Sequence, residues 1–312
     1  MISETIFEVE TEPAIVHCST IIETVDSTLL CVWYQGSYET AKDTVLKISR
    51  CLPGETRWTS PEVLFDFRGA PLGNPVLWSV PGSARVYVTF SVLTAESWET
   101  SLLFYAWSED SGSTWSPPAL FISQPAFMGK TKPIPDGRGG MLFPLYHETD
   151  YCPFIMLLDD PEHPIGSALI AETMARKKAI QPALHRIDSN RIIMLCRTNQ
   201  SSVWRSISFN NGYSWSILRP TSLPNPDSAI DLFSTQSGGI GIVYNPSATQ
   251  RDVLAIAETD DGGENWNVTG EIVRGAGEFS YPFAMNGRDG SVMVSYTDNR
   301  YAIRFVRFGG SR

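Results

Sequence analysis

The sequence lacks the patterns that define several common protein classes. Its five cysteines are an odd number without a C-x-x-C pair, which argues against a disulfide framework and fits thiols in a reducing compartment. The longest apolar runs fall short of the roughly 18 to 20 residues that cross a bilayer, so no membrane partner is expected. The four histidines lack metal-ligand spacing, and we expect no metal site.

Nucleotide-binding glycine motifs are also absent, because the chain contains neither G-x-G-x-x-G nor a P-loop, and no cofactor is expected. Charged residues make up only 19% of the chain, and 34 acidic residues against 24 basic ones give a net charge of -10. This balance excludes nucleic acid as an expected partner, since binding it requires clustered positive charge. An anionic ligand must therefore meet a local group of basic side chains.

The first residues are acidic. Glu4, Glu8, Glu10 and Glu12 stand where an export signal would have a basic start followed by an apolar stretch. We therefore expect a cytoplasmic protein.

Short stretches of alternating apolar and polar residues dominate the chain. Examples are 28–34 (TLLCVWY), 84–90 (ARVYVTF), 191–196 (RIIMLC) and 291–296 (SVMVSY), separated by clusters of Gly, Pro, Asn and Asp. This pattern is typical of an antiparallel sandwich, barrel or propeller. A helix is considered only for 167–178, where a strand followed by a polar loop fits equally well.

A repeated turn distinguishes among these all-β folds. The segments 108–115 (SEDSGSTW), 208–215 (SFNNGYSW) and 259–266 (TDDGGENW) share the pattern Ser/Thr-x-Asp/Asn-x-Gly-x-x-Trp, and a weaker copy ends at Trp58. The tryptophans are 57, 100 and 51 residues apart, so the middle gap spans two periods. Periods of this length with several strands each indicate propeller blades. We predict one six-bladed β-propeller domain over residues 1–312, closed by a strand near residues 6–9 that completes the last blade.

The repeated turn has a structural explanation. Its Asp or Asn oxygen accepts hydrogen bonds from the backbone of the turn. Its Gly supplies a positive φ, and its Trp fills the space between neighbouring blades. Because these turns lie at the rim, we expect them to take no part in chemistry.

This turn is the Asp-box, and the chain resembles the sialidase superfamily, in particular its sialidase-like or BNR-repeat branch. Other segments that carry the resemblance are 17–23 (HCSTIIE), 74–78 (NPVLW), 180–184 (IQPAL) and 279–283 (FSYPF). A sialidase holds its substrate carboxylate with three arginines, uses an Asp as acid/base, and attacks with a Tyr polarised by a Glu. The resemblance implies that Arg197 and Arg251 are the second and third arginines and that Asp43 is the acid/base.

Three other positions depart from the sialidase pattern. His17 stands in place of the first arginine, Ala179 in place of the Glu, and Phe279 in place of the nucleophile, with Tyr281 two residues on. A histidine cannot reproduce the planar bidentate grip of an arginine on a carboxylate. We therefore expect a non-classical site in which His17, Asp43 and Tyr281 are the catalytic candidates.

Further candidates lie at predicted strand ends and loops. Arg197 and Arg251 form the expected anion clamp, and the additional substrate-binding candidates are Lys132, Glu39, Tyr146 and Asp231, with Glu148 beside Tyr146. Each has a structural alternative, as a core histidine, a turn residue, a rim charge or an inter-blade ion pair. Asn74 is expected in a turn because it precedes a proline.

Three functions remain open. The first is an enzyme acting by acid/base chemistry on a glycosidic bond of an acidic or deoxy sugar, as a hydrolase or lyase. The second is a cytoplasmic biosynthetic enzyme acting on a small carboxylate-bearing metabolite. The third is a propeller that binds glycans or proteins without catalysis. In the two enzyme readings the partner is a small-molecule or glycan substrate, expected to be anionic.

Overall fold

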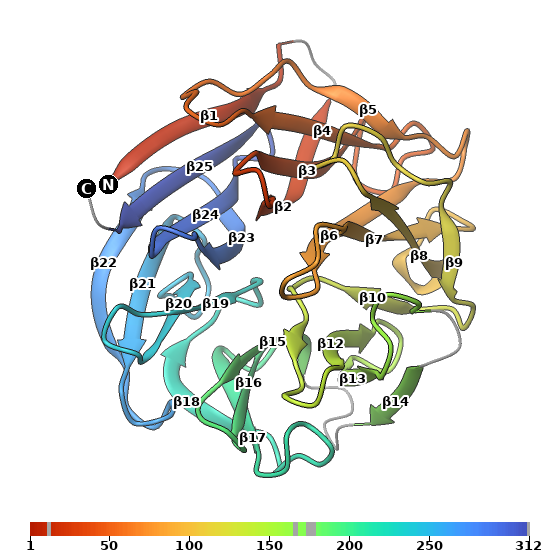
Figure 1. Cartoon of the computed structure of the whole chain (residues 1–312). Helices are drawn as coiled ribbons and strands as arrows, with labels where there is room; N and C mark the ends of the chain where they lie inside the picture. Colours follow the sequence, from red (N-terminus) through yellow and green to blue (C-terminus); the bar gives the residue numbers. More distant parts are fainter. Residues whose placement is uncertain (11–13, 165–167, 173–178, 311–312) are drawn as a thin grey trace.

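The computed structural model describes residues 1–10, 14–164, 168–172 and 179–310, and its strands form six antiparallel sheets. Figure 1 shows these sheets arranged radially around one axis, as the blades of a propeller. Five sheets have four strands and one has five. The all-β, six-bladed architecture predicted from the sequence is therefore confirmed. Among the described residues, the single helical element is the 3₁₀ helix η1 (Trp98–Thr100).

The strands of each blade are given from the axis outwards. The first blade contains β2 (Ile15–Glu23), β3 (Leu29–Gly36), β4 (Val45–Cys51) and β5 (Glu62–Phe65). The second contains β6 (Leu72–Ser79), β7 (Val86–Leu93), β8 (Ser101–Ser108) and β9 (Ala119–Ile122). The third contains β10 (Phe127–Gly129), β12 (Met141–His147), β13 (Cys152–Leu158) and β14 (Ala168–Glu172), and β11 (Ile134–Pro135) also pairs with β12. The fourth blade contains β15 (Ala179–Arg186), β16 (Ile192–Thr198), β17 (Ser202–Ser208) and β18 (Arg219–Pro224). The fifth contains β19 (Asp231–Ser234), β20 (Ile240–Tyr244), β21 (Val253–Thr259) and β22 (Asn267–Arg274). The sixth contains β23 (Phe279–Asn286), β24 (Ser291–Asp298), β25 (Ala302–Gly309) and β1 (Ile2–Glu8).

The four alternating stretches singled out in the sequence lie in β3, β7, β16 and β24, as predicted. The stretch considered for a helix contains strand β14, while residue 167 and residues 173–178 lie outside the described residues. Asn74, expected in a turn, lies instead inside β6. All five cysteines are buried thiols. No helix of the described residues has the length and apolar character to cross a membrane.

The first strand of the chain closes the propeller. In Figure 1, β1 lies beside β25, and the two pair antiparallel from Ile2 opposite Arg307 to Glu8 opposite Ala302. The side chain of Ile6 is buried, and the Phe7 ring stacks on Trp33 of the first blade with 5.6 Å between ring centroids. The predicted closing strand is confirmed, and it ties the last blade to the first.

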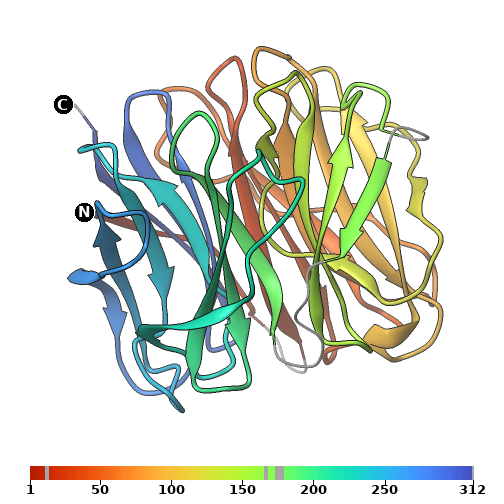
Figure 2. The same ribbon diagram turned by 90° about the horizontal axis from the view of Figure 1, so that it is seen from below.

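Successive strands of a blade alternate in direction, so the two ends of the axis differ. We call the end at which the innermost strands begin the cavity face, and the opposite end the turn face; Figure 2 shows the strands running between them. The three repeated turns connect the third and fourth strands of their blades, and they lie at the turn face. They are therefore separated from the cavity face by the length of a strand.

The repeated turns share one hydrogen-bond pattern. In the second blade, Ser108 Oγ accepts from the Gly112 N–H (2.8 Å), Asp110 Oδ1 accepts from the Thr114 N–H (2.8 Å), and Trp115 Nε1 donates to the Gly112 carbonyl (3.1 Å). The same three contacts measure 2.8, 2.9 and 3.0 Å in 208–215, and 3.3, 3.0 and 3.2 Å in 259–266. Gly112 has φ +82°, and a Cβ there would lie 2.5 Å from Leu30 of the preceding blade. Each turn thus joins two blades.

Candidate functional site

Three side chains reach the axis from irregularities in the innermost strands. Asn74, Gln181 and Tyr281 have φ values of +44°, +51° and +54°, and the strand register shifts at each of them. A bulge of this kind inserts one extra residue and re-aims a side chain. Each of the three is followed by a proline, which has no N–H to donate to the sheet. The combination marks three places where the inner strands lose regular pairing; β2 has a similar bulge at Cys18, with a φ of +55°, but no proline follows it.

These side chains help to form a cavity at the cavity face, which we call the axial cavity. It encloses about 510 Å³, including its opening to solvent. Its lining comes from five of the six blades: Tyr34, Glu39, Asn74, Trp98, Met128, Tyr146, Glu148, Tyr151, Ile180, Gln181, Arg197 and Tyr281. A concave site with several convergent polar groups is the usual form of a small-molecule site.

A hydrogen-bonded network crosses the floor of the axial cavity. Asn74 Nδ2 donates to the Tyr146 hydroxyl (2.8 Å), and Gln181 Nε2 approaches the same hydroxyl at 3.5 Å. Arg197 Nη1 donates to Gln181 Oε1 (3.2 Å) and to the Tyr281 hydroxyl (2.8 Å). Three side chains on bulges and two on regular strands therefore hold one another in place.

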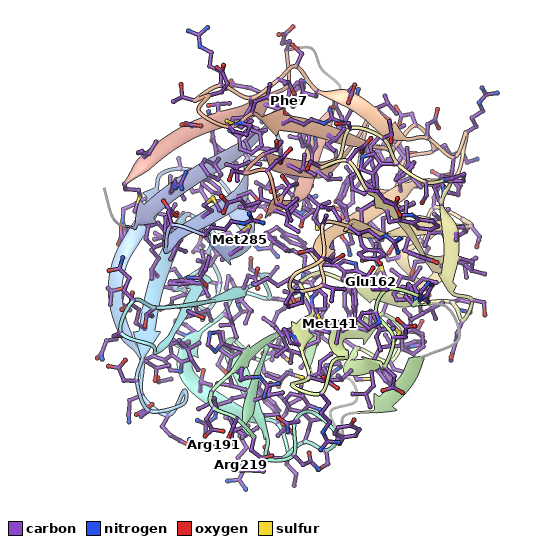
Figure 3. All side chains as sticks on the ribbon, in the orientation of Figure 1. Phe7, Met141, Glu162, Arg191, Arg219 and Met285 are labelled. Atoms are coloured by element: carbon purple, nitrogen blue, oxygen red, sulfur yellow. The ribbon has the colours of Figure 1, made fainter. Side chains whose placement is uncertain are left out.

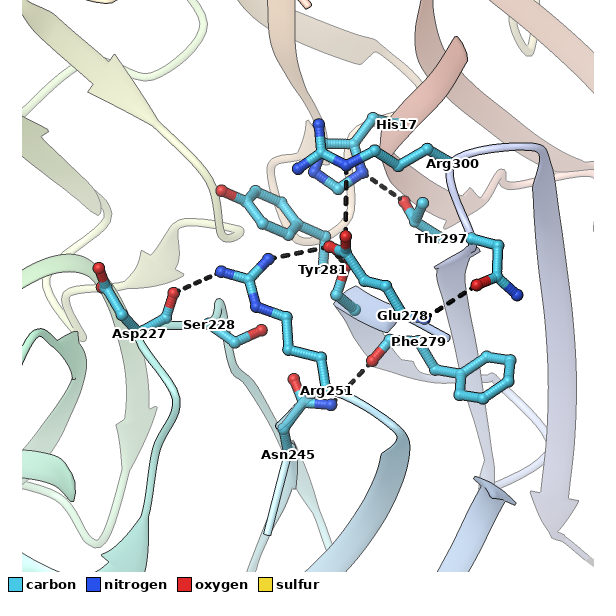
Figure 4. A network of polar contacts seen from close by, with 12 residues as sticks. His17, Asp227, Ser228, Asn245, Arg251, Glu278, Phe279, Tyr281, Thr297 and Arg300 are labelled. Carbon is cyan, nitrogen blue, oxygen red and sulfur yellow. Dashed lines mark hydrogen bonds and ion pairs between the residues drawn. The ribbon is translucent and has the colours of Figure 1, made fainter. Parts of the chain in front are cut away.

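A chain of ion pairs follows the rim from the fourth blade round to the first. Arg197 Nε donates to Asp227 (2.7 Å), and Arg251 contacts both the Asp227 carbonyl (2.7 Å) and Glu278 (2.9 Å). Arg300 lies between Glu278, at 3.4 Å, and Glu39, with which it forms a short ion pair. Figure 4 shows the part of this chain around Arg251, Glu278 and Arg300.

The ion pairs affect the acidity of the rim carboxylates. Burial raises the pKa of Glu278, but the Ser280 hydroxyl and the charges of Arg300 and Arg251 outweigh it, so the net shift is downward. Burial raises the pKa of Asp227 as well, but its contacts with Arg197 outweigh that effect, so the net shift is again downward. These two carboxylates are therefore ionised partners of the arginines.

Glu148 is the exception among the carboxylates of the site. It lines the axial cavity and no hydrogen bond or ion pair of its carboxylate is found among the described residues. Burial raises its pKa, and the charges of Glu99 and Asp227 add to that shift, while Arg197 opposes it. A carboxyl group with a raised pKa retains its proton to higher pH than an ordinary one and is better suited to act as a general acid.

His17 lies beneath the cavity and not in its lining. Its side chain is 1% exposed, its Nδ1 lies 2.9 Å from Thr297 Oγ1, and its Nε2 has no hydrogen-bond partner among the described residues. The imidazole packs against the Tyr281 ring with 4.1 Å between centroids. Burial, followed by the charges of Arg300 and Arg251, lowers its pKa well below the usual value, so the ring is neutral.

Cations also surround Tyr281. Besides the hydrogen bond from Arg197, the buried ammonium of Lys130 lies 5.8 Å from the centroid of its ring and donates to the Pro282 carbonyl (3.2 Å). No carboxylate among the described residues contacts the Tyr281 hydroxyl. In place of a carboxylate that could polarise Tyr281, the site has the amide of Gln181, which is neutral and cannot accept a proton.

The other predicted residues lie apart from the axial cavity. Asp43 is exposed in the loop between β3 and β4 and accepts hydrogen bonds from Ser37. Lys132 pairs with the buried Asp231 at 3.0 Å and lines a separate cavity of about 610 Å³, including its opening to solvent, with residues further along β2, β6 and β23. The structure therefore brings together Glu39, Tyr146, Arg197 and Tyr281, with His17 and Arg251 next to them.

Several residues of the site were not predicted from the sequence. Gln181, Asn74 and Trp98 line the cavity, while Arg300 and Glu278 complete the rim. The signal for Asn74 and Gln181 is the proline that follows each of them, as it follows Tyr281. Arg300 carries no comparable signal: it lies in the turn between β24 and β25 at a φ of +59°, a conformation that arginine rarely adopts.

The fold and the site define this chain as a sialidase-type β-propeller. Its sequence matches the BNR repeat-like domain over residues 27–294, and the chain belongs to this family. No curated protein sequence matches it significantly.

Solved structures with the same architecture include several glycan-active enzymes. A Hadza microbial sialidase superposes with a TM-score of 0.78 at 16% identity, covering 94% of this chain and 65% of its own. The leech intramolecular trans-sialidase gives 0.78 at 13% identity, with 99% and 70% covered. The intramolecular trans-sialidase from Ruminococcus gnavus gives 0.77 at 13% identity, with 97% and 96% covered. At these identities the likeness shows the fold alone.

Proposed function

We propose that this protein is an enzyme that cleaves a glycosidic bond of an acidic or deoxy sugar bound in the axial cavity, with Glu148 as the general acid. The observation that carries the proposal is the contrast between the two carboxylates that line the cavity. Glu148 has a raised pKa and no partner among the described residues, whereas Glu39 is paired with Arg300 and accepts a hydrogen bond from Trp98 Nε1 (3.2 Å). Most glycoside hydrolases use two carboxyl groups in different environments.

In the proposed reaction, Glu148 transfers its proton to the oxygen of the leaving group as the glycosidic bond breaks. Water adds to the anomeric carbon and releases its proton to Glu39. The phenol oxygen of Tyr281 lies in the same cavity and offers a lone pair to the positive charge that develops on the sugar ring. This assignment replaces the roles expected for His17 and Asp43, neither of which lines the cavity.

Arg197 supports an acidic substrate. Its Nε and Nη1 are engaged by Asp227, Gln181 and Tyr281, but its Nη2 makes no hydrogen bond within the described part of the chain. That nitrogen is free to donate to a substrate carboxylate or hydroxyl. The Ruminococcus gnavus enzyme was solved in complex with oseltamivir carboxylate and the leech enzyme in complex with 2,7-anhydro-Neu5Ac.

The experiment is a panel of aryl glycosides of sialic acid, glucuronic acid and rhamnose, with ultraviolet detection of unsaturated products to reveal a lyase. Glu148→Gln should lower kcat by about 10² to 10⁴, the usual contribution of a general acid. Because the acid must be protonated to work, activity should fall as the pH rises through the raised pKa of Glu148. The variant should lose this alkaline limb.

Glu99→Gln is the matched control, because Glu99 is an exposed carboxylate on the same face that does not line the cavity. It should retain wild-type kcat on the acid side of the profile and move the alkaline limb slightly to lower pH, because the charge of Glu99 contributes to the raised pKa of Glu148. Turnover of a panel substrate that is equal in wild type and Glu148→Gln would contradict the assignment of Glu148. Absence of turnover across the panel would contradict the hydrolytic proposal for these sugars.

The surroundings of Tyr281 favour a second candidate, a propeller that binds an acidic glycan without catalysis. No carboxylate among the described residues contacts the Tyr281 hydroxyl. Since Arg251 and Arg300 are already paired with Glu278 and Glu39, Arg197 would be the residue that contacts the anion. In this case calorimetry should detect binding of the free sugar acids without turnover. Glu148→Gln would then leave the affinity unchanged, whereas Arg197→Met would weaken it.

A further inference from the structure

A second cavity lies at the turn face between the second and third blades, and we call it the blade 2–3 groove. It has a volume of about 700 Å³, including its opening to solvent, and its walls include Arg85, Tyr87, Tyr105, Trp107, Glu109 and Glu162. Figure 3 labels Glu162, which follows β13 of the third blade. The other five residues lie in or directly beside β7 and β8 of the second blade.

The groove is distinct from the axial cavity. Arg85 precedes the first residue of β7, while Trp98, which lines the axial cavity, follows its last residue. An eight-residue strand is roughly 26 Å long at about 3.3 Å per residue. A monosaccharide in one cavity therefore cannot contact the other.

Aromatic rings form one wall of the groove. Tyr105 and Trp107 are two residues apart on β8, so they share a face, and their rings stack with 5.8 Å between centroids at 27°. Behind them, the fully buried Tyr87 stacks on Trp78 at 4.2 Å and 12°. The rings are thus held in fixed positions before any ligand arrives. Aromatic faces pack well against the C–H faces of sugar rings.

Two carboxylates and one guanidinium provide the polar groups. Arg85 Nη2 pairs with Glu109 Oε1 (2.6 Å), and its Nη1 lies 3.4 Å from Glu162 Oε2. The Tyr87 hydroxyl donates to the same Glu162 oxygen (3.0 Å). The second oxygen of each carboxylate has no hydrogen bond among the described residues and is free to accept from a ligand hydroxyl.

The charges of the groove select between classes of ligand. One guanidinium and two carboxylates leave a local charge of one negative unit, which disfavours the carboxylate of an acidic sugar. A neutral sugar meets aromatic faces for its apolar side and carboxylate oxygens for its hydroxyls. This composition differs from that of the axial cavity, where Arg197 is part of the lining.

We propose that the blade 2–3 groove is a second carbohydrate site that binds a neutral saccharide. A glycan whose charged terminus is processed elsewhere also contains neutral residues, and this groove would hold the protein on such a polymer. The site does not depend on the chemistry assigned to the axial cavity.

Isothermal titration calorimetry of the full chain tests this site with short oligomers of glucose, galactose, mannose, xylose and N-acetylglucosamine. At least one should bind with a dissociation constant in the range of about 0.1 to 1 mM. Trp107→Ala should weaken that binding at least about tenfold, because it removes the half-buried indole ring from the aromatic wall of the groove. Glu162→Gln keeps the shape of the wall and should weaken binding severalfold, which preserves the test if Trp107→Ala fails to fold.

Phe209→Ala is the matched control, since Phe209 is an exposed aromatic residue at the equivalent turn of the fourth blade. It should bind as wild type, and so should Glu148→Gln, whatever its activity. The proposal is overturned if no neutral oligomer binds, or if Trp107→Ala and Glu162→Gln both bind like wild type. Preferential binding of tetramethylammonium would also overturn it, because the groove would then be a cation site.

Discussion

His17 illustrates how a single residue can occupy a functional position without performing the reaction. It lies under Tyr281 and is surrounded by the charges of Arg300, Arg251, Lys130 and Arg197, all of which oppose its protonation. Its neutral ring therefore packs against the Tyr281 ring and helps to hold the tyrosine side chain in position. A guanidinium in the same place would add a further positive charge to an already cationic region.

We predict that His17 stays neutral at pH values at which an ordinary histidine, with a pKa of about 6.5, is already protonated. Nitrogen NMR of histidine-labelled protein checks this, with the His17 signal assigned by its loss in His17→Gln. Because the folded pKa lies below the unfolded one, the unfolded state takes up the proton first as the pH falls. The contribution of this residue to stability is therefore complete above about pH 6.5 and declines below it.

The same signal in urea provides the control, since it should titrate near pH 6.5 once burial is lost. A protonation midpoint near that value in the folded protein would contradict the neutral assignment. His17 would then again be a candidate proton donor.

Sequence reasoning at the residue scale identified about half of the site. Arg197 and Tyr281 were predicted because residues around them carry recognisable motifs. Gln181 was missed because counting alternate residues along a strand assumes regular pairing, and the bulges at Gln181 and Tyr281 break it. Asp43 was selected by its place after the first hairpin, but side-chain direction in a loop does not follow from spacing.

At the scale of elements, the internal geometry of the repeated turns was predictable because the contacts that define it are local. The three hydrogen bonds that the turns share join residues within four positions of one another, so the pattern of residue types determines the shape of the turn. Contacts with other blades, such as that of Arg50 with the Gly112 carbonyl, are not contained in the pattern. The turns also differ in one informative way. Asp110 in the second blade is replaced by Asn210 in the fourth, with the same backbone contacts.

This pair predicts a difference in pH dependence. Asp110→Ala and Asn210→Ala should each lower the free energy of unfolding at pH 7 by about 1 kcal/mol, through lost hydrogen bonds. Hydrogen bonds from Thr114 lower the pKa of Asp110 to about 2. The Asp110 contribution is therefore present above the unfolded pKa of about 3.9 and is lost as the pH falls through about 2.

Urea unfolding between pH 7 and pH 3 measures both effects. The difference between wild type and Asp110→Ala should shrink on the acid side, whereas that for Asn210→Ala should remain constant. If the two differences in unfolding free energy depend on pH in the same way, ionisation of Asp110 adds nothing to the stability of the turn.

At the scale of the whole molecule, the closing strand joins residues that are almost 300 positions apart. The β1–β25 pairing and the buried Ile6 make the first residues part of the last blade. The number of blades was predictable from the period of the turns, and the closing strand from the alternation near the N-terminus. The charges that line the rim were not predictable, because Arg300 and Glu39 meet only after the ring has closed.

A chain that lacks residues 1–9 should lose its cooperative unfolding transition, because the last blade then exposes an unpaired edge and an apolar face. Within the intact chain, Ile6→Ala should cost about 2 to 5 kcal/mol, as expected for a buried large-to-small change. Ile2→Ala, at an exposed position of the same strand, should change stability by less than about 0.5 kcal/mol. Circular dichroism with thermal and urea unfolding measures all three.

A synthetic peptide of residues 1–9 should restore the transition to the shortened chain when added in excess. If the shortened chain unfolds at the same midpoint as the intact one, β1 contributes nothing to closure and the prediction fails.

The left-handed positions at Asn74, Gln181 and Tyr281 have one more consequence. There the backbone, and not the identity of the side chain, determines the direction in which the residue points. Asparagine tolerates this conformation readily, whereas glutamine and tyrosine adopt it at an energetic disadvantage. Replacing either of them would relieve the backbone while changing the chemistry at the axis. The side chains at these positions can therefore change, and with them the specificity of the axial cavity, while the fold of the propeller stays the same.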